Sequence, residues 1–102
     1  MAYASSKSAV HGPTRALALE LAGDGITVNA IGPGPIATAL FERVNPPGAP
    51  ATQTILATVP VGRLGRPEEV AHHVASLLDA RAGFTTGQVV YVCGGMTVGW
   101  AA

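Results

Sequence analysis

The sequence predicts an α/β fold in which two parallel strands are flanked by helices. The expected order is helix, strand, a long irregular excursion, helix and strand. The first strand is apolar on both faces, which is typical of a parallel sheet covered by helices on both sides. A strand, a crossing helix and a second strand form one right-handed βαβ unit, so the chain is expected to be a layered α/β structure.

The first helix is expected at residues 3–22, where good helix formers dominate. Apolar residues that share one of its faces, at spacings of seven and four, are Val10, Leu17 and Leu21. Pro13 removes a backbone donor, at a cost of about 3 kcal/mol in a helix interior, so a kink or a late helix start is expected. Gly23 and Gly25 are expected to end the helix, because glycine takes the left-handed cap conformation without a side-chain penalty.

The remaining elements follow from apolar periodicity and from the positions of glycine and proline. The stretch NPPGAP, residues 45–50, carries too much proline for a regular element. Pro67, Glu68 and Glu69 suit the first turn of the last long helix, because carboxylates there complement the helix dipole. The expected elements are a strand at 26–31, a loop at 32–35, short helices at 38–44 and 52–58, a helix at 65–79 and a strand at 89–92.

The composition excludes several classes of function. The 102 residues are 48% apolar and carry six basic and six acidic side chains, so no basic surface for nucleic acid or for a membrane is expected. Neither a transmembrane span nor a signal peptide is expected. Cys93 is the one cysteine, which excludes an internal disulfide and suits the cytoplasm. His72 and His73 point about 100° apart on a helix, so no metal site is expected.

Tyr3 and Lys7 are the first candidate for chemistry. Residues four apart stack on one helix face, so the phenol and the ammonium are expected to lie close together. A phenol ionises near pH 10, roughly three units too high for acid–base work at neutral pH, and a neighbouring cation favours the phenolate. The alternative is a surface pair that contributes a few tenths of a kcal/mol to the helix.

The segment after the first strand is the second candidate. Ligands of open parallel sheets bind beyond the carboxyl ends of the strands, which is where residues 32–38 are expected. Pro33 and Gly34 would allow close approach to the backbone, and the Thr38 hydroxyl could bond an amide or a phosphate oxygen. The alternative is a tight turn in which Thr38 caps the next helix.

Five motifs together resemble the C-terminal part of a classical short-chain dehydrogenase/reductase. In chain order they are the run from Tyr3 to Lys7 (YASSK), ALALELAGDGITVNAIGPGPIAT, PVGRLGRPEEVA, TTGQVVYV and the pair Gly94 and Gly95. Each is weak alone, but their order and spacing cover almost the whole chain. The resemblance implies a Rossmann-type, doubly wound parallel sheet, of which this chain is a C-terminal portion.

The resemblance also implies a reaction. Tyr3 would deliver or remove the hydroxyl proton while hydride passes between NAD or NADP and a small alcohol or ketone. Lys7 would hold the nicotinamide ribose and lower the pKa of Tyr3. Residues implied to line the nicotinamide and pyrophosphate end are Pro33, Gly34, Ile36 and Thr38.

Residues 39–58 would form a mobile substrate lid. Its implied pocket residues are Leu40, Phe41, Ile55 and Leu56, although burying a lid face is the commoner use of such side chains. A homodimer or homotetramer is implied for the intact parent protein.

Residues 1–102 are expected to be one partial domain, because the family's N-terminal half has no counterpart here. Without it, marginal stability or self-association and no appreciable activity are expected of the chain alone. The competing interpretations are a noncatalytic remnant or oligomerisation module that binds no cofactor, and a stand-alone anion-binding βαβ unit at residues 32–34. Arg63 and Arg66 are expected to form surface ion pairs or to contact a cofactor phosphate, and Cys93 is expected to be a small buried apolar residue.

Overall fold

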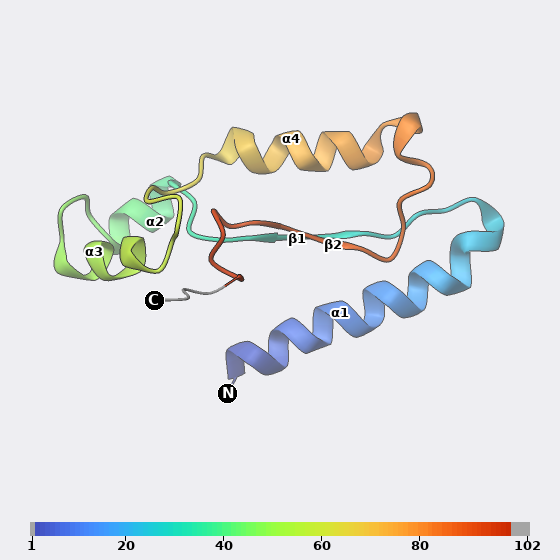
Figure 1. The fold of residues 1–102 in the computed structure, drawn as a ribbon, viewed down its shortest axis with the longest axis horizontal. Coiled ribbons are helices and arrows are strands. Elements are labelled where there is room, and N and C mark those ends of the chain that lie inside the picture. The colour runs from blue at the N-terminus through green and yellow to red at the C-terminus, as the bar shows by residue number, and fades with distance from the viewer. Residues whose placement is uncertain (1, 99–102) are drawn as a thin grey trace. The chain divides into compact units, whose positions relative to one another are not determined.

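The computed structural model describes residues 2–98, and of residues 2–9 it describes the backbone alone (Figure 1). The elements in chain order are α1 (Ala2–Leu21), η1 (Ala22–Asp24), β1 (Ala30–Pro33), α2 (Ala39–Val44), α3 (Pro50–Ala57), α4 (Pro67–Leu78), η2 (Ala80–Ala82) and β2 (Val89–Val92). The chain forms two compact units, residues 1–31 with 73–90 and residues 32–72 with 91–102. No helix within residues 2–98 is long and apolar enough to cross a membrane.

The strands β1 and β2 form one two-stranded parallel sheet. The Ala30 amide donates to Gln88 O, and the Gly34 amide donates to Val92 O, so the pairing keeps one register along the sheet. Successive amides of a strand point in opposite directions, so only every second residue donates to β2. Ala30 and Gly34 are such donors and Pro33 is not, so its missing amide hydrogen removes no bond to β2. The predicted fold class, two parallel strands with flanking helices, is confirmed.

The predicted start of the first strand is wrong. β1 begins at Ala30 rather than at residue 26, and it includes two residues assigned from the sequence to a loop. Before Ala30, side-chain bonds supplement one backbone bond: the Gly87 amide donates to Val28 O at 2.8 Å, Thr86 Oγ1 accepts from the Val28 amide at 3.0 Å, and Asn29 Nδ2 donates to Thr85 O at 3.0 Å. The segment is therefore tethered to residues 85–88 without regular backbone pairing.

Helix α1 is little buried over residues 10–21, the part whose side chains the structure describes. Thr14 and Ala18 are buried there, whereas Val10 and Leu17 are 51% and 45% exposed, although helical spacing places Thr14 on the same face as Val10 and Leu17. Ala18 packs beside Gly87, where an added Cβ would be in ordinary van der Waals contact, 3.4 Å from Ala18 Cβ. The helix begins at Ala2, well before Pro13, which excludes the late start that was one of the two expected effects of this proline. The other, a kink, stays a prediction.

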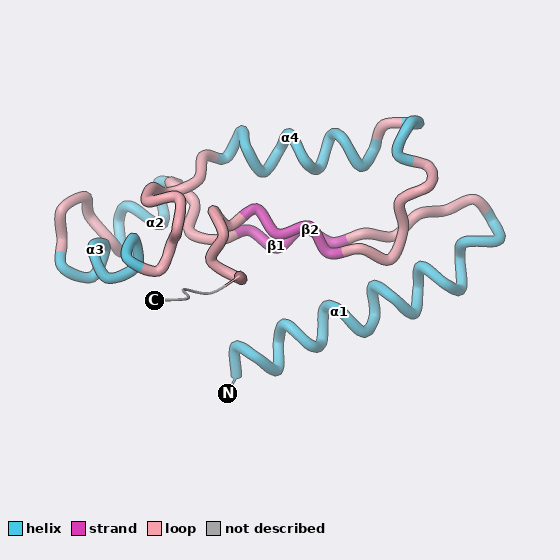
Figure 2. Tube along the Cα trace, in the orientation of Figure 1, coloured by secondary structure: helices cyan, strands magenta, loops and turns pink. Residues whose placement is uncertain are grey.

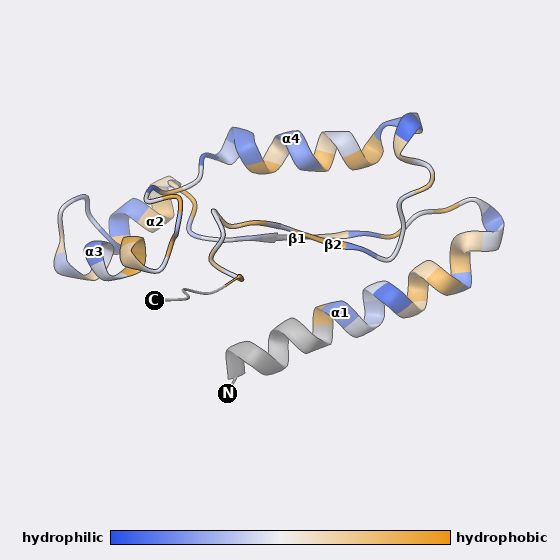
Figure 3. Cartoon of the chain, viewed as in Figure 1, coloured by the Kyte–Doolittle hydropathy of each residue, from blue (hydrophilic) through white to orange (hydrophobic). Residues whose placement is uncertain are grey.

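The C-terminal part of α4 contributes to the same unit. Its residues Val74, Leu77 and Leu78, together with the segment before and within β1, line a cavity of about 290 Å³. Apolar residues of α4 gather along one side of the helix (Figure 3). This side is only partly covered, because Leu78 is 82% exposed.

In the second unit, loops connect α2, α3 and the start of α4 (Figure 2). Thr38 caps α2, since its Oγ1 accepts from the Phe41 amide at 3.1 Å. Thr52 is buried, and its hydroxyl donates to Pro46 O at 2.7 Å, which fixes the proline-rich turn to α3. Pro50 begins α3, contrary to the expectation that it belongs to no regular element, because a helix tolerates proline at its first position.

Candidate active site

The backbone of Tyr3 and Lys7 lies in α1, which begins at Ala2. Their α-helical spacing places both residues on one face of the helix. Their side chains lie outside the described part of the structure, so the proximity of phenol and ammonium stays a prediction.

The chain leaving β1 makes close backbone contacts with the chain leaving β2. A Cβ on Gly34 would lie 2.8 Å from Cys93 Cα and 2.9 Å from Cys93 Cβ, distances that real Cβ atoms do not adopt. Glycine at residue 34 therefore permits this approach. The sequence suggested that the missing side chain makes room for a ligand, whereas the described contact is with the chain itself.

The next residues are held by a parallel bridge between Ile36 and Gly65. The Gly65 amide donates to Pro35 O at 2.9 Å, and the Ala37 amide donates to Gly65 O at 2.8 Å. Ile36 lies across Gly65, where an added Cβ would be 2.7 Å from Ile36 Cδ1. Ile36 thus packs on the protein backbone, and its predicted contact with a cofactor stays a prediction.

Thr38 serves as the α2 cap, which was the alternative interpretation of this residue. Its side chain is exposed, and its Oγ1 is used as an acceptor by Phe41. A hydroxyl that accepts one hydrogen bond keeps its own hydrogen for donation. Capping and contact with a phosphate oxygen are therefore compatible.

The predicted substrate residues lie on the two short helices. Leu40 is 68% exposed, and Phe41, Ile55 and Leu56 are half-buried. The structure places Leu40 and Phe41 on α2, and it places Ile55 and Leu56 on α3. Their use in a substrate pocket stays a prediction.

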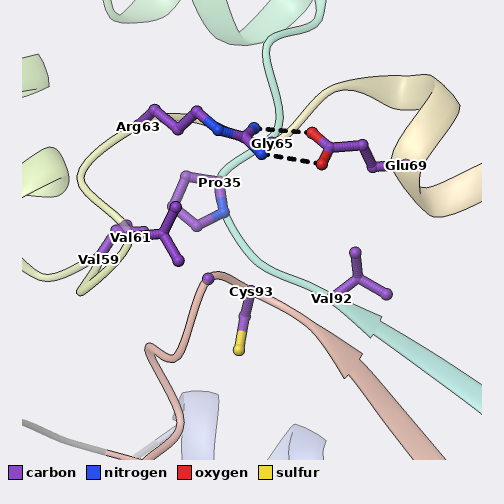
Figure 4. Close-up of a pocket in the computed structure, with 9 residues that line it drawn as sticks. Pro35, Val59, Val61, Arg63, Gly65, Glu69, Val92 and Cys93 are labelled. Carbon is purple, nitrogen blue, oxygen red and sulfur yellow. Dashed lines mark hydrogen bonds and ion pairs between the residues drawn. The ribbon is translucent and has the colours of Figure 1, made fainter.

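A cavity of about 190 Å³ lies next to the Gly65 bridge (Figure 4). Its lining includes Pro35, Val59, Arg63, Glu69, Val92 and Cys93. The Arg63 guanidinium faces the Glu69 carboxylate, whereas Cys93 Sγ points away from this pair.

Arg63 and Glu69 form a two-pronged ion pair. Arg63 Nη1 donates to Glu69 Oε1 at 2.7 Å, and Arg63 Nη2 donates to Glu69 Oε2 at 2.9 Å. The hydrogen bond from Arg63, reinforced by the donating Arg66 amide, lowers the pKa of Glu69 to about 2. The surface pairing expected of Arg63 and Arg66 is confirmed, since Arg66 Nε also lies 3.5 Å from Glu69 Oε1.

Glu69 has a role that the sequence did not indicate. It was expected to complement the helix dipole, and in the structure it also accepts from the Arg66 amide at 2.9 Å. Only the glutamate half of a capping box occurs here, because Arg66 stands where a serine or threonine would complete the motif. The sequence therefore lacked the usual signal for this contact.

Cys93 is half-buried rather than fully buried. Burial acts to raise the pKa of its thiol, but hydrogen bonds from the Thr97 backbone and side chain and from the Gly95 and Met96 backbone outweigh it, so the pKa is lowered. Cys93 Sγ lies 3.6 Å from Thr97 Oγ1. No group of three potential metal ligands occurs among the side chains that the structure describes.

Together, the parallel sheet, its flanking helices and the order of the motifs define a Rossmann-type α/β protein. The sequence model of the family described as enoyl-(acyl carrier protein) reductase matches residues 1–97. The chain belongs to the short-chain dehydrogenase/reductase family, as its motifs predict.

Curated relatives have the same residue as this chain at about two fifths of the aligned positions, over nearly the whole chain. A (2S)-[(R)-hydroxy(phenyl)methyl]succinyl-CoA dehydrogenase subunit of Thauera aromatica is 44% identical over 94% of this chain and 38% of its own length. The 3-oxoacyl-[acyl-carrier-protein] reductase of Thermotoga maritima is 42% identical over the same shares. Acetoacetyl-CoA reductase of Cupriavidus necator is 41% identical over 95% of this chain and 38% of its own length. The chain therefore spans well under half the length of these relatives.

Solved structures agree with this assignment. A candidate 2-deoxy-D-gluconate 3-dehydrogenase from Agrobacterium tumefaciens with bound NADP superimposes with a TM-score of 0.84 at 36% identity, over 94% of this chain and 39% of that one. A candidate NAD(P)-dependent gluconate 5-dehydrogenase from Beutenbergia cavernae, with NADP at low occupancy, superimposes with a TM-score of 0.83 at 40% identity. The match covers 95% of this chain and 39% of that one.

Proposed function

We propose that this chain is the catalytic and substrate-binding segment of an NAD(P)-dependent oxidoreductase that interconverts a small alcohol and a ketone. The observation that carries the proposal is the placement of Tyr3 and Lys7 four residues apart in α1, in a chain of this family. The NADP bound to two structural neighbours and the reductase names of the relatives support the cofactor.

Tyr3 supplies the proton in this proposal. During reduction, its phenolic hydrogen passes to the carbonyl oxygen as hydride reaches the carbonyl carbon; in the reverse direction the phenolate takes the hydroxyl proton. Lys7 favours the phenolate through its positive charge and holds the nicotinamide ribose. When bound, the nicotinamide supplies or accepts the hydride.

The residues after β1 fit the nicotinamide and pyrophosphate end of such a cofactor. Thr38 is exposed and has a hydroxyl hydrogen available for a phosphate oxygen, and its position is fixed by the α2 cap. Pro33, Gly34 and Ile36 would line the same end. Contacts within the chain hold two of these residues in place: Gly34 lies against Cys93, and Ile36 lies against Gly65.

Residues 39–58 form the proposed substrate lid. It consists of α2, α3 and the turn between them, and its apolar residues Leu40, Phe41, Ile55 and Leu56 would face the substrate. The exposure of Leu40 leaves it available for such a contact. We propose that the lid belongs to the same partial domain as the rest of residues 1–102. We further propose that the enzyme is cytoplasmic and acts as a homodimer or homotetramer.

The test uses the full product of the gene, assayed for NADPH-dependent reduction of acetoacetyl-CoA and of small ketones. Tyr3→Phe should lower kcat by at least about 100-fold, because it removes a general acid, while the Kd for NADPH changes little. Ser6→Ala, a neighbouring loss of a hydroxyl, is the matched control and should retain activity. Equal turnover by Tyr3→Phe and the wild type would refute the role of Tyr3.

The exposed apolar side chains of α1 favour a second candidate, a noncatalytic oligomerisation module. Val10, Leu17 and Leu19 are 51%, 45% and 82% exposed. A gene product that self-associates but does not bind NADPH would support this candidate. Substituting these residues with polar ones should then dissociate the assembly, as measured by sedimentation.

A further inference from the structure

We propose that Arg63 and Glu69 are positioning residues that hold the loop after β1 in its binding arrangement through Gly65. This inference rests on the proposed function, because it concerns the loop that would contact the cofactor. All of the contacts that carry it lie within the second unit.

Glu69 closes a short turn around Gly65. Its Oε1 accepts from the Arg63 side chain at 2.7 Å and from the Arg66 amide at 2.9 Å, so one carboxylate oxygen binds residues on both sides of Gly65. Arg63 Nη1 also donates to Leu64 O at 3.1 Å, inside the same turn. The turn is thereby tied to the first residues of α4.

Gly65 connects this turn to the loop after β1 by two backbone hydrogen bonds. It donates to Pro35 O and accepts from the Ala37 amide, so both hydrogen bonds of the bridge converge on one residue. The Ile36 side chain packs on it, since a Cβ added to Gly65 would lie 2.7 Å from Ile36 Cδ1 and would displace the end of that side chain. Movement of Gly65 therefore releases two backbone bonds and one packing contact at once.

The loop in turn fixes the position of Thr38 by a backbone hydrogen bond. The Thr38 amide donates to Ile36 O at 2.8 Å, and Thr38 Oγ1 caps α2 through Phe41. The exposed hydroxyl of Thr38 thus has an orientation that depends on the bridge at Gly65. The ion pair is itself exposed, with Arg63 53% and Glu69 32% accessible, so its main consequence is expected to be local rather than a large gain in global stability.

The test compares Glu69→Gln with Glu68→Gln in the full product of the gene. Both substitutions remove one negative charge from the first turn of α4, but only the first alters the contacts around Gly65. In Glu69→Gln, amide hydrogen exchange in residues 35–41 should become faster, and the Kd for NADPH should rise about tenfold, because the apparent Kd rises as the ordered fraction of the loop falls. kcat at saturating NADPH should change little.

Arg63→Lys is a second variant that keeps the charge but cannot form both hydrogen bonds with one carboxylate. It should show the same pattern to a smaller extent, and it keeps the test decisive if Glu69→Gln does not fold. Exchange and Kd values in both variants that match those of Glu68→Gln would overturn the inference. If the wild type binds no NADPH, the proposed function fails, and hydrogen exchange alone still decides whether Arg63 and Glu69 hold the loop.

Discussion

The start of α1 and the loop after β1 are the two segments to which we assign function; short-range interactions shape the first, and contacts between distant residues shape the second. Tyr3 and Lys7 lie in one helix, so helical geometry alone sets the spacing of their backbone positions. Residues 34–38 have no such periodicity, and their path depends on Cys93 and Gly65, which come much later in the chain. The proposed proton-transfer pair is therefore specified locally, whereas the proposed cofactor loop depends on tertiary contacts.

The largest expected effect disturbs the local part. Lys7→Ala should lower kcat/KM for alcohol oxidation by about 100-fold or more and shift its pH profile to higher pH, because the phenolate of Tyr3 loses the cation that stabilises it. Steady-state rates measured between about pH 6 and pH 10, the ordinary pKa of a tyrosine phenol, report both effects. Lys7→Arg keeps the charge and should show the smaller shift; an unshifted profile in Lys7→Ala would contradict the role of Lys7.

A smaller effect disturbs the tertiary part. Gly34→Ala should lower the free energy of unfolding by about 1–3 kcal/mol, because the new Cβ would lie 2.8 Å from Cys93 Cα and force the two chain segments apart. Gly12→Ala is the matched control in α1, where an added Cβ meets nothing within 4 Å, and it should stabilise by about 0.5–1 kcal/mol. Urea unfolding of the full gene product measures both. Equal effects of the two substitutions would show that close packing at Gly34 is unimportant.

The smallest expected effect is the pH dependence of the ion pair at Glu69. The folded state lowers the pKa of Glu69 from 4.5 to about 2, so its ionised form stabilises the fold above about pH 4.5, and this contribution is lost as the pH falls toward 2. The urea midpoint of the wild type should therefore fall more steeply over this range than that of Glu69→Gln. Glu68→Gln should keep the slope of the wild type, and identical slopes in all three proteins would exclude a stabilising role for the pair.

The sequence predicted most helices because their signals are local. Residues 3–22 and 65–79 became α1 and α4 with small shifts at their ends, and the strand at 89–92 is confirmed. The predicted start of β1 was wrong, and the sequence did not reveal that Thr14 and Ala18 are buried while Val10 and Leu17 are exposed, because periodicity does not show which residues the rest of the chain covers. Ala30 begins the ladder because Gln88 O accepts its amide hydrogen, whereas the Val28 amide donates to the Thr86 side chain.

The candidate site divides in the same way. Motifs predicted functional roles for Tyr3, Lys7 and the segment after β1, and these roles stay predictions, whereas the family that the motifs predict is confirmed. They did not reveal that Gly34 packs on Cys93 or that Glu69 holds the turn around Gly65. These contacts join residues far apart in sequence, and each glycine alone is equally consistent with a loop or a ligand contact.

By itself, the sequence determined the family, the helical spacing of Tyr3 and Lys7, and the alternation of helices with strands, because these depend on residue type and short-range geometry. Only the tertiary structure decided where β1 begins, which of residues 10–21 in α1 are buried, and which backbone groups hold Ile36 and Thr38. The physical reason is that hydrogen bonds and close packing between distant segments need partners whose positions exist only after folding.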